Sequence, residues 1–106
     1  MKGYLIKFYM EQKRQYQGKA LFQWLIDCAK QLQIHGTTVT SAIAGIGRDD
    51  EYHSSHFFEL SDQPIQVEII VNEQQSQQLF ALLQQQSFSL FYIKVPIEYG
   101  SLGQGA

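Results

Sequence analysis

Strand-like and helix-like segments alternate along this chain in an order that few folds can accommodate. Residues 4–10 (YLIKFYM) are rich in aromatic and branched side chains, which is typical of a β-strand. Residues 20–34 then place apolar side chains at helical spacing, and Gly36 is expected to end that helix. Residues 37–44 (TTVTSAIA) return to the alternating, β-branched pattern of a strand. The first half of the chain therefore predicts a strand, a helix and a second strand.

The second half repeats this arrangement. Residues 57–60 are predicted to begin a return strand, which continues after an interruption through the alternating residues 65–71 (IQVEIIV). Asn72 stands where a helix N-cap is expected, and Gln75 three residues later completes a weak capping box. The segments predicted after it are a helix over 73–86 and a last strand over 89–98.

The full order predicts an α+β fold, a ferredoxin-like βαββαβ sandwich with an antiparallel sheet and both helices on one face. A length of 106 residues fits one domain over 1–106. Two parts of it are expected to be mobile, a loop over about 45–61 and the Gly-rich tail over 99–106.

The face of the sheet that the helices leave open is informative. Leu, Ile and Tyr on such a face form a patch that monomers usually avoid, which favours an oligomer with sheets packed face to face. The alternative is an ordinary half-hydrated sheet. The residues predicted to face the helices are Ile6, Phe8, Ile65, Val67, Ile69, Phe91, Ile93 and Val95. Those predicted on the open face are Leu5, Lys7, Tyr9, Gln66, Glu68, Ile70, Leu90, Tyr92 and Lys94.

Composition excludes several classes of protein. The formal net charge of -2 argues against a broad nucleic-acid surface. Cys28 is the only cysteine, so no intrachain disulfide can form. No apolar run approaches the length of a membrane span, and the N-terminus lacks the pattern of a signal peptide. These features predict a cytoplasmic protein without membrane insertion.

The polar segment after the second strand carries the residues most suited to chemistry. Arg48, three acidic residues, His53 and His56 lie within RDDEYHSSH, and two His beside carboxylates could bind Zn²⁺ or Cu²⁺. The alternative is a solvated loop in which these residues are present by composition alone. Ser54 next to His53 does not make a catalytic triad, because a triad needs groups that meet in space. We therefore predict that the chain is not an enzyme.

Three segments together resemble one family, the PII-like proteins catalogued as Domain of Unknown Function 190. The resemblance covers nearly the whole chain and rests on the order and spacing of its motifs. Its segments are GKALFQWLIDCAKQLQIHGTTV (residues 18–39), AIAGIGRDDEYH (residues 42–53) and ELSDQPIQVEIIVN (residues 59–72).

This resemblance implies a homotrimer that senses a small ligand. PII proteins bind adenine nucleotides in clefts between subunits and contact a partner protein through the loop between the second and third strands. Here that loop corresponds to about residues 45–61, and the ligand is expected near its base. The residues that the resemblance suggests for ligand binding are Gly36, Thr37, Thr38, Gly45, Gly47, Arg48 and His53.

One departure from the PII pattern concerns the phosphates. PII proteins hold them with a Gly-rich basic loop after the second helix, whereas residues 84–88 (QQQSF) contain neither Gly nor Lys. A metal-binding trimer with an architecture similar to CutA is the alternative function, with His53 and His56 as its metal ligands.

Overall fold

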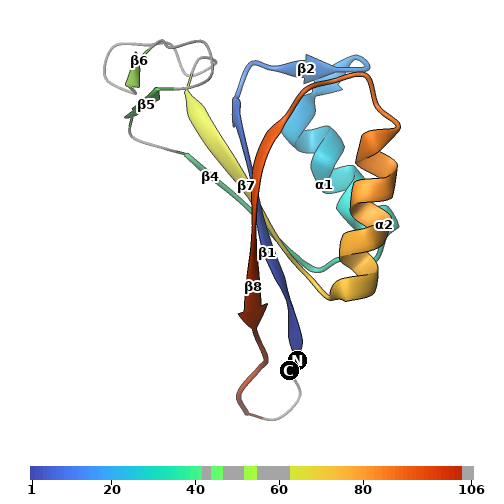
Figure 1. Ribbon diagram of the computed structural model, residues 1–106. Helices are drawn as coiled ribbons and strands as arrows, with labels where there is room; N and C mark the ends of the chain where they lie inside the picture. The colour runs from blue at the N-terminus through green and yellow to red at the C-terminus, as the bar shows by residue number, and fades with distance from the viewer. Residues whose placement is uncertain (42–43, 47–51, 55–62, 104–106) are drawn as a thin grey trace.

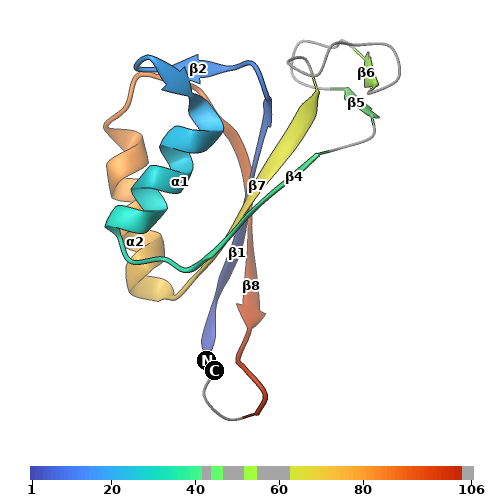
Figure 2. The ribbon, with the colours of Figure 1, turned by 180° about the vertical axis from the view of Figure 1, so that it is seen from behind.

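The computed structural model describes residues 1–41, 44–46, 52–54 and 63–103. Its main elements are the strands β1 (Lys2–Glu11), β4 (Gly36–Ser41), β7 (Pro64–Val71) and β8 (Phe91–Glu98) and the helices α1 (Leu21–Gln31) and α2 (Glu73–Gln84). The four strands form one antiparallel sheet in the order β4-β7-β1-β8. Both helices cover the same face of it (Figures 1 and 2). The predicted ferredoxin-like arrangement is confirmed.

The core fills the space between the sheet and the two helices. Alternate residues of β1 and β7 turn toward the helices, and Ile6, Phe8, Val67 and Ile69 are at most 1% exposed. Full burial of such a side chain contributes about 1.5–3 kcal/mol, so this layer supplies most of the drive for folding. The helices contribute Leu21, Leu25, Ala29, Leu79 and Leu83 to the same cluster.

The first helix ends earlier than the sequence predicts. α1 stops at Gln31, and Gln33 rather than Gly36 takes the left-handed backbone, with φ of 60°. The amides of Gln33 and Ile34 donate to carbonyls of the last helical turn at 3.0 and 2.9 Å, the pattern of a Schellman motif. Because Ile34 is only 4% exposed, its burial compensates for a glutamine where glycine is usual.

The predicted start of the second helix is confirmed. The Gln75 amide donates to Asn72 Oδ1 at 2.8 Å, and the Asn72 amide donates to Gln75 Oε1 at 3.0 Å, which completes the capping box. α2 ends at Gln84, slightly before the predicted end. Among the described residues, no helix is long and apolar enough to cross a membrane.

A short hairpin occupies part of the segment between β1 and α1. β2 (Gln15–Tyr16) pairs with β3 (Lys19–Ala20) across Gln17 and Gly18. Both turn residues have positive φ, 52° and 81°, as a type I′ turn requires. Asn-Gly commonly marks this turn, so Gln-Gly is a weak signal for it.

The last strand presents the opposite face from the one predicted. In its register with β1, Tyr92 pairs with the buried Phe8, and Lys94 pairs with the buried Ile6. β8 is an edge strand, and the ring of Phe80 on α2 packs 4.8 Å from the Tyr92 ring. The helix-covered side of β8 therefore carries Tyr92 and Lys94 in place of large aliphatic side chains. The residues on the open face of β8 are Phe91, Ile93 and Val95, which the alternation pattern predicts to face the helices.

Part of the loop predicted over 45–61 is a second small hairpin. β5 (Ala44–Ile46) pairs antiparallel with β6 (Tyr52–Ser54). Since β4 ends at Ser41, the single strand predicted over 37–44 is divided between β4 and β5. The return-strand residues predicted over 57–60 lie outside the described residues.

The start of β1 and the end of β8 lie side by side at one end of the sheet (Figure 1). The N-terminal ammonium of Met1 donates to the Tyr99 carbonyl at 2.9 Å, and the Tyr99 amide donates to the Met1 carbonyl at 2.8 Å. These bonds continue the pairing of β1 with β8 by one residue.

Gly3 gives a direct test of this packing. A Cβ at Gly3 would lie 2.0 Å from the Val71 carbonyl oxygen, a backbone atom that cannot move without disturbing β7. We expect Gly3→Ala to lower the free energy of unfolding by about 2–3 kcal/mol, measured by urea denaturation. Gly100→Ala is the control, because a Cβ there meets nothing within 4 Å. Equal stability of the two variants would contradict the close approach of β1 and β7.

Candidate functional site

The open face of the sheet exposes apolar side chains that no helix covers. Phe91, Val95 and Ile70 are 51%, 40% and 38% exposed, although their side chains are apolar. At the centre of this face, Lys7 and Glu68 pair across β1 and β7 with 3.9 Å between Nζ and Oε1. This face is more apolar than the sequence predicts, because β8 turns its aliphatic side toward it.

Residues Gly36, Thr37 and Thr38 form the first half of β4. Gly36 pairs with Ile70, and a Cβ at Gly36 would lie 3.0 Å from the Ile70 Cβ. Thr37 lies on the helix-covered face, where its Oγ1 is buried without a hydrogen-bond partner among the described residues. Thr38 lies on the open face, paired with Glu68. Successive strand residues point to opposite faces, so the two hydroxyls cannot serve one ligand on one face.

The other predicted ligand-binding residues follow the far end of β4. Gly45 and His53 are register partners in the β5–β6 hairpin. Gly36 lies about 17 Å from Ser41 along the strand, at about 3.4 Å per residue, so one subunit does not bring Gly36 to this hairpin. Gly47 and Arg48 lie outside the described residues.

The metal alternative falls on the same segment. Within the part of the chain that the structure describes, no group of three His, Cys, Asp or Glu could hold a metal ion. His56 and the acidic residues 49–51 lie outside the described residues.

An arginine from a distant part of the sequence lies against the loop after α2. The Arg14 guanidinium Nη2, just before β2, donates to the Ser89 carbonyl between α2 and β8. Tyr16 joins the same region, since its hydroxyl donates to Gln86 Oε1 at 2.8 Å. Sequence reasoning missed Arg14 because it lies 75 residues before Ser89, and only the hairpin brings the two together.

A second charged cluster supports the edge of the sheet. The hydrogen bond between the Tyr4 hydroxyl and the Glu73 carboxylate raises the pKa of Tyr4 and lowers the pKa of Glu73. Lys94 Nζ lies 4.1 Å from the Tyr4 ring centroid and 5.4 Å from the Phe80 ring centroid. These contacts join β1, α2 and β8, and they account for a lysine on the helix-covered face.

Comparisons with known proteins agree on the family. The family model DUF190, described as Uncharacterized ACR, matches residues 3–90. A UPF0166 protein from Aquifex aeolicus (strain VF5) is 33% identical over 75 residues, which cover 70% of this chain and 71% of that protein.

Solved structures agree on the fold. A Thermus thermophilus protein described as PII-like and signaling gives a TM-score of 0.66 at 20% identity, over 92% of this chain and 88% of the other. The structure of CPII from Thiomonas intermedia K12, bound to ADP, AMP and acetate, gives a TM-score of 0.63 at 18% identity, over 94% of this chain and 90% of CPII. The antiparallel sheet with two helices on one face is the fold that these structures share with the chain. The chain therefore belongs to the DUF190 family and has a PII-like fold.

Proposed function

We propose that this chain is a PII-like regulatory protein that forms a homotrimer and senses an adenine nucleotide at the clefts between its subunits. Residues 45–61 then contact a partner protein, and the bound ligand controls that contact. The proposal omits Thr37, because its hydroxyl is buried on the helix-covered face. The residues proposed around the ligand are the other six that the resemblance suggests, Gly36, Thr38, Gly45, Gly47, Arg48 and His53. The proposal assigns no catalytic step to the chain.

The observation that carries the nucleotide proposal is the likeness to CPII, whose structure contains ADP and AMP. The likeness extends over 94% of this chain, so the whole arrangement of strands and helices is available to form an equivalent cleft. The two ends of β4 offer a physical reason for a site between subunits. Gly36 begins β4, whereas Gly45 lies in β5, beyond the other end of β4. Because the two residues are far apart along one subunit, a single ligand contacts both of them only where two subunits meet.

The open face of the sheet supports the homotrimer. Phe91, Val95 and Ile70 are apolar and exposed, and burying apolar surface contributes about 25 cal/mol per Å². Lys7 and Glu68 on the same face offer opposite charges that can pair within or between subunits. Association through this face protects from water the side of the sheet that lacks helices.

Arg14 is proposed to contact the nucleotide phosphates. The chain lacks a Gly-rich, Lys-containing loop after α2, and Arg14 is the cation that the structure places against that loop. A guanidinium forms charge-assisted, bidentate hydrogen bonds with phosphate oxygens. One arginine from the hairpin can therefore perform part of the task that the missing loop residues perform in PII proteins.

Nucleotide binding is tested directly by isothermal titration calorimetry. We expect ADP and AMP to bind the protein with a stoichiometry of one per subunit, and GDP to bind at least tenfold more weakly. GDP is the matched control because it changes only the base. Absence of heat from both adenine nucleotides would contradict the proposed ligand, whatever the oligomeric state.

The trimer interface is tested by a charge on the open face. We expect Val95→Glu to shift the native mass from trimer to monomer, because it buries an unpaired carboxylate at the interface. Native mass spectrometry measures the change. Gln78→Glu on the exposed side of α2 is the control and should leave the trimer intact. A trimeric Val95→Glu variant would exclude the open face as the interface.

The role of Arg14 is tested by its neutral substitution. Arg14→Gln is expected to weaken ADP binding about tenfold, since hydrogen bonds to charged groups contribute about 1.5–3 kcal/mol. Arg14→Lys keeps the charge and should recover part of the affinity. Lys30→Gln on α1 removes an equal charge elsewhere and is the control. If Arg14→Gln and Lys30→Gln bind ADP with equal affinity, Arg14 does not contact the phosphates.

A further inference from the structure

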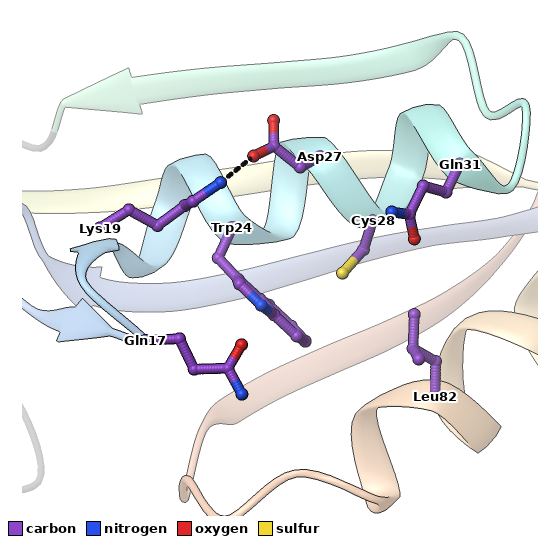
Figure 3. Close-up of a pocket in the computed structure, with 7 residues that line it drawn as sticks. All are labelled: Gln17, Lys19, Trp24, Asp27, Cys28, Gln31 and Leu82. Atoms are coloured by element: carbon purple, nitrogen blue, oxygen red, sulfur yellow. Dashed lines mark hydrogen bonds and ion pairs between the residues drawn. The ribbon is translucent and has the colours of Figure 1, made fainter.

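An open groove with a volume of about 430 Å³ lies between the two helices, and none of the residues that line it is proposed above for the nucleotide. The groove is seen in Figure 3 from the helical side, with the strands behind it. Its residues come from the β2–β3 hairpin and from both helices. They are Gln17, Lys19, Trp24, Asp27, Cys28, Gln31 and Leu82.

The indole of Trp24 is the fixed wall of the groove. The rings of Tyr16 and Phe88 contact it edge-on, with centroids at 5.1 and 5.4 Å and interplanar angles of 86° and 84°. Tyr16 is itself held by its hydrogen bond to Gln86. A ring held from two sides is already in place before a ligand arrives, which reduces the entropy that binding must overcome.

The charges at the rim cancel each other. Lys19 Nζ donates to Asp27 Oδ2 at 2.8 Å, the interaction drawn in Figure 3, and Gln23 Nε2 donates to Asp27 Oδ1 at 3.0 Å. The hydrogen bond from Lys19 is the main reason that the pKa of Asp27 is lowered. Burial raises the pKa of the Cys28 thiol, so this wall is also uncharged at neutral pH. A phosphate or carboxylate would have to compete with Asp27 for Lys19.

Two glutamine amides supply the polar contacts that remain. Gln31 lies on α1 beside Cys28, and Gln17 extends from the hairpin turn beside Trp24 (Figure 3). Gln17 has a φ of 52°, in a left-handed region where Gly, Asn or Asp is favoured and other side chains carry a cost. Such a cost is often found where a side chain serves a site. Each amide both donates and accepts hydrogen bonds.

We propose that this groove binds a small, uncharged, planar molecule whose edge carries neighbouring donors and acceptors, as a nucleobase or lactam does. Trp24 offers a ring surface or edge, and Leu82 with the Cys28 thiol offers apolar contact. The Gln17 amide beside Trp24 matches the ligand's own amide-type edge. The groove shares no lining residue with the proposed nucleotide site, so the proposal stands apart from the proposed function.

Uracil is a suitable probe, and the single tryptophan of the chain provides a specific signal. The indole N–H gives one cross-peak in a ¹H–¹⁵N correlation spectrum. We expect uracil to shift it saturably, and orotate, the same ring with a carboxylate, to bind at least tenfold more weakly. No saturable shift with uracil up to its solubility, or equal affinity for orotate, would overturn the proposal.

Gln17→Gly separates the amide from the fold. Glycine suits the positive φ of this turn, so the hairpin is retained and only the side chain is lost. Uracil affinity is expected to fall about fivefold, the effect of losing one neutral hydrogen bond. Gln78→Ala on α2, outside the groove, is the control and should bind uracil as the unmodified chain does. Unchanged uracil affinity in Gln17→Gly would exclude Gln17 as a ligand contact and overturn the proposed groove site.

Discussion

The pairing of β1 with both β7 and β8 is the constraint on which the rest of the structure depends. β1 is central to the sheet, and its register fixes the face of every residue in its two neighbours. Ile6 and Phe8 are buried beneath the helices, so a shift of one residue would turn both toward water. Because Gly3 has no side chain, β1 can lie close to the Val71 carbonyl of β7 near the start of the chain.

Coverage by helices on one face alone has a functional consequence. The helix-covered face is closed by a continuous apolar core, whereas the open face exposes Phe91, Val95 and Ile70. A monomer with this surface would be prone to association.

The helical layer holds a separate arrangement of contacts. The β2–β3 hairpin brings Arg14 to the loop after α2 and places Tyr16 against Trp24 and Phe88. One hairpin thus contributes to two surfaces, a cationic one near Ser89 and the groove beside Trp24. A protein of this size can therefore carry two ligand sites that are distinct in charge as well as position.

The sequence by itself determined the elements that rest on local pattern. The alternation over residues 65–71 predicted β7, and the helical spacing after Gly18 predicted α1. The Asn72 and Gln75 pair predicted the start of α2. The order of these elements was sufficient for the ferredoxin-like fold, because few topologies satisfy it. The motifs around them were also sufficient for the DUF190 family.

Tertiary structure decided what depends on partners distant in the chain. Apolar residues occur on both faces of β8, so its sequence alone does not decide which face meets the helices. Only its register with β1 turned Lys94 toward Tyr4 and Val95 toward the open face. α1 ended at Gln31 because Ile34 is buried in the core, although Gly36 is the stronger local signal. Arg14 reached Ser89 through a hairpin with a weak turn signature. Local propensities differ by less than the free energy of burying one large side chain, so packing determined each of these outcomes.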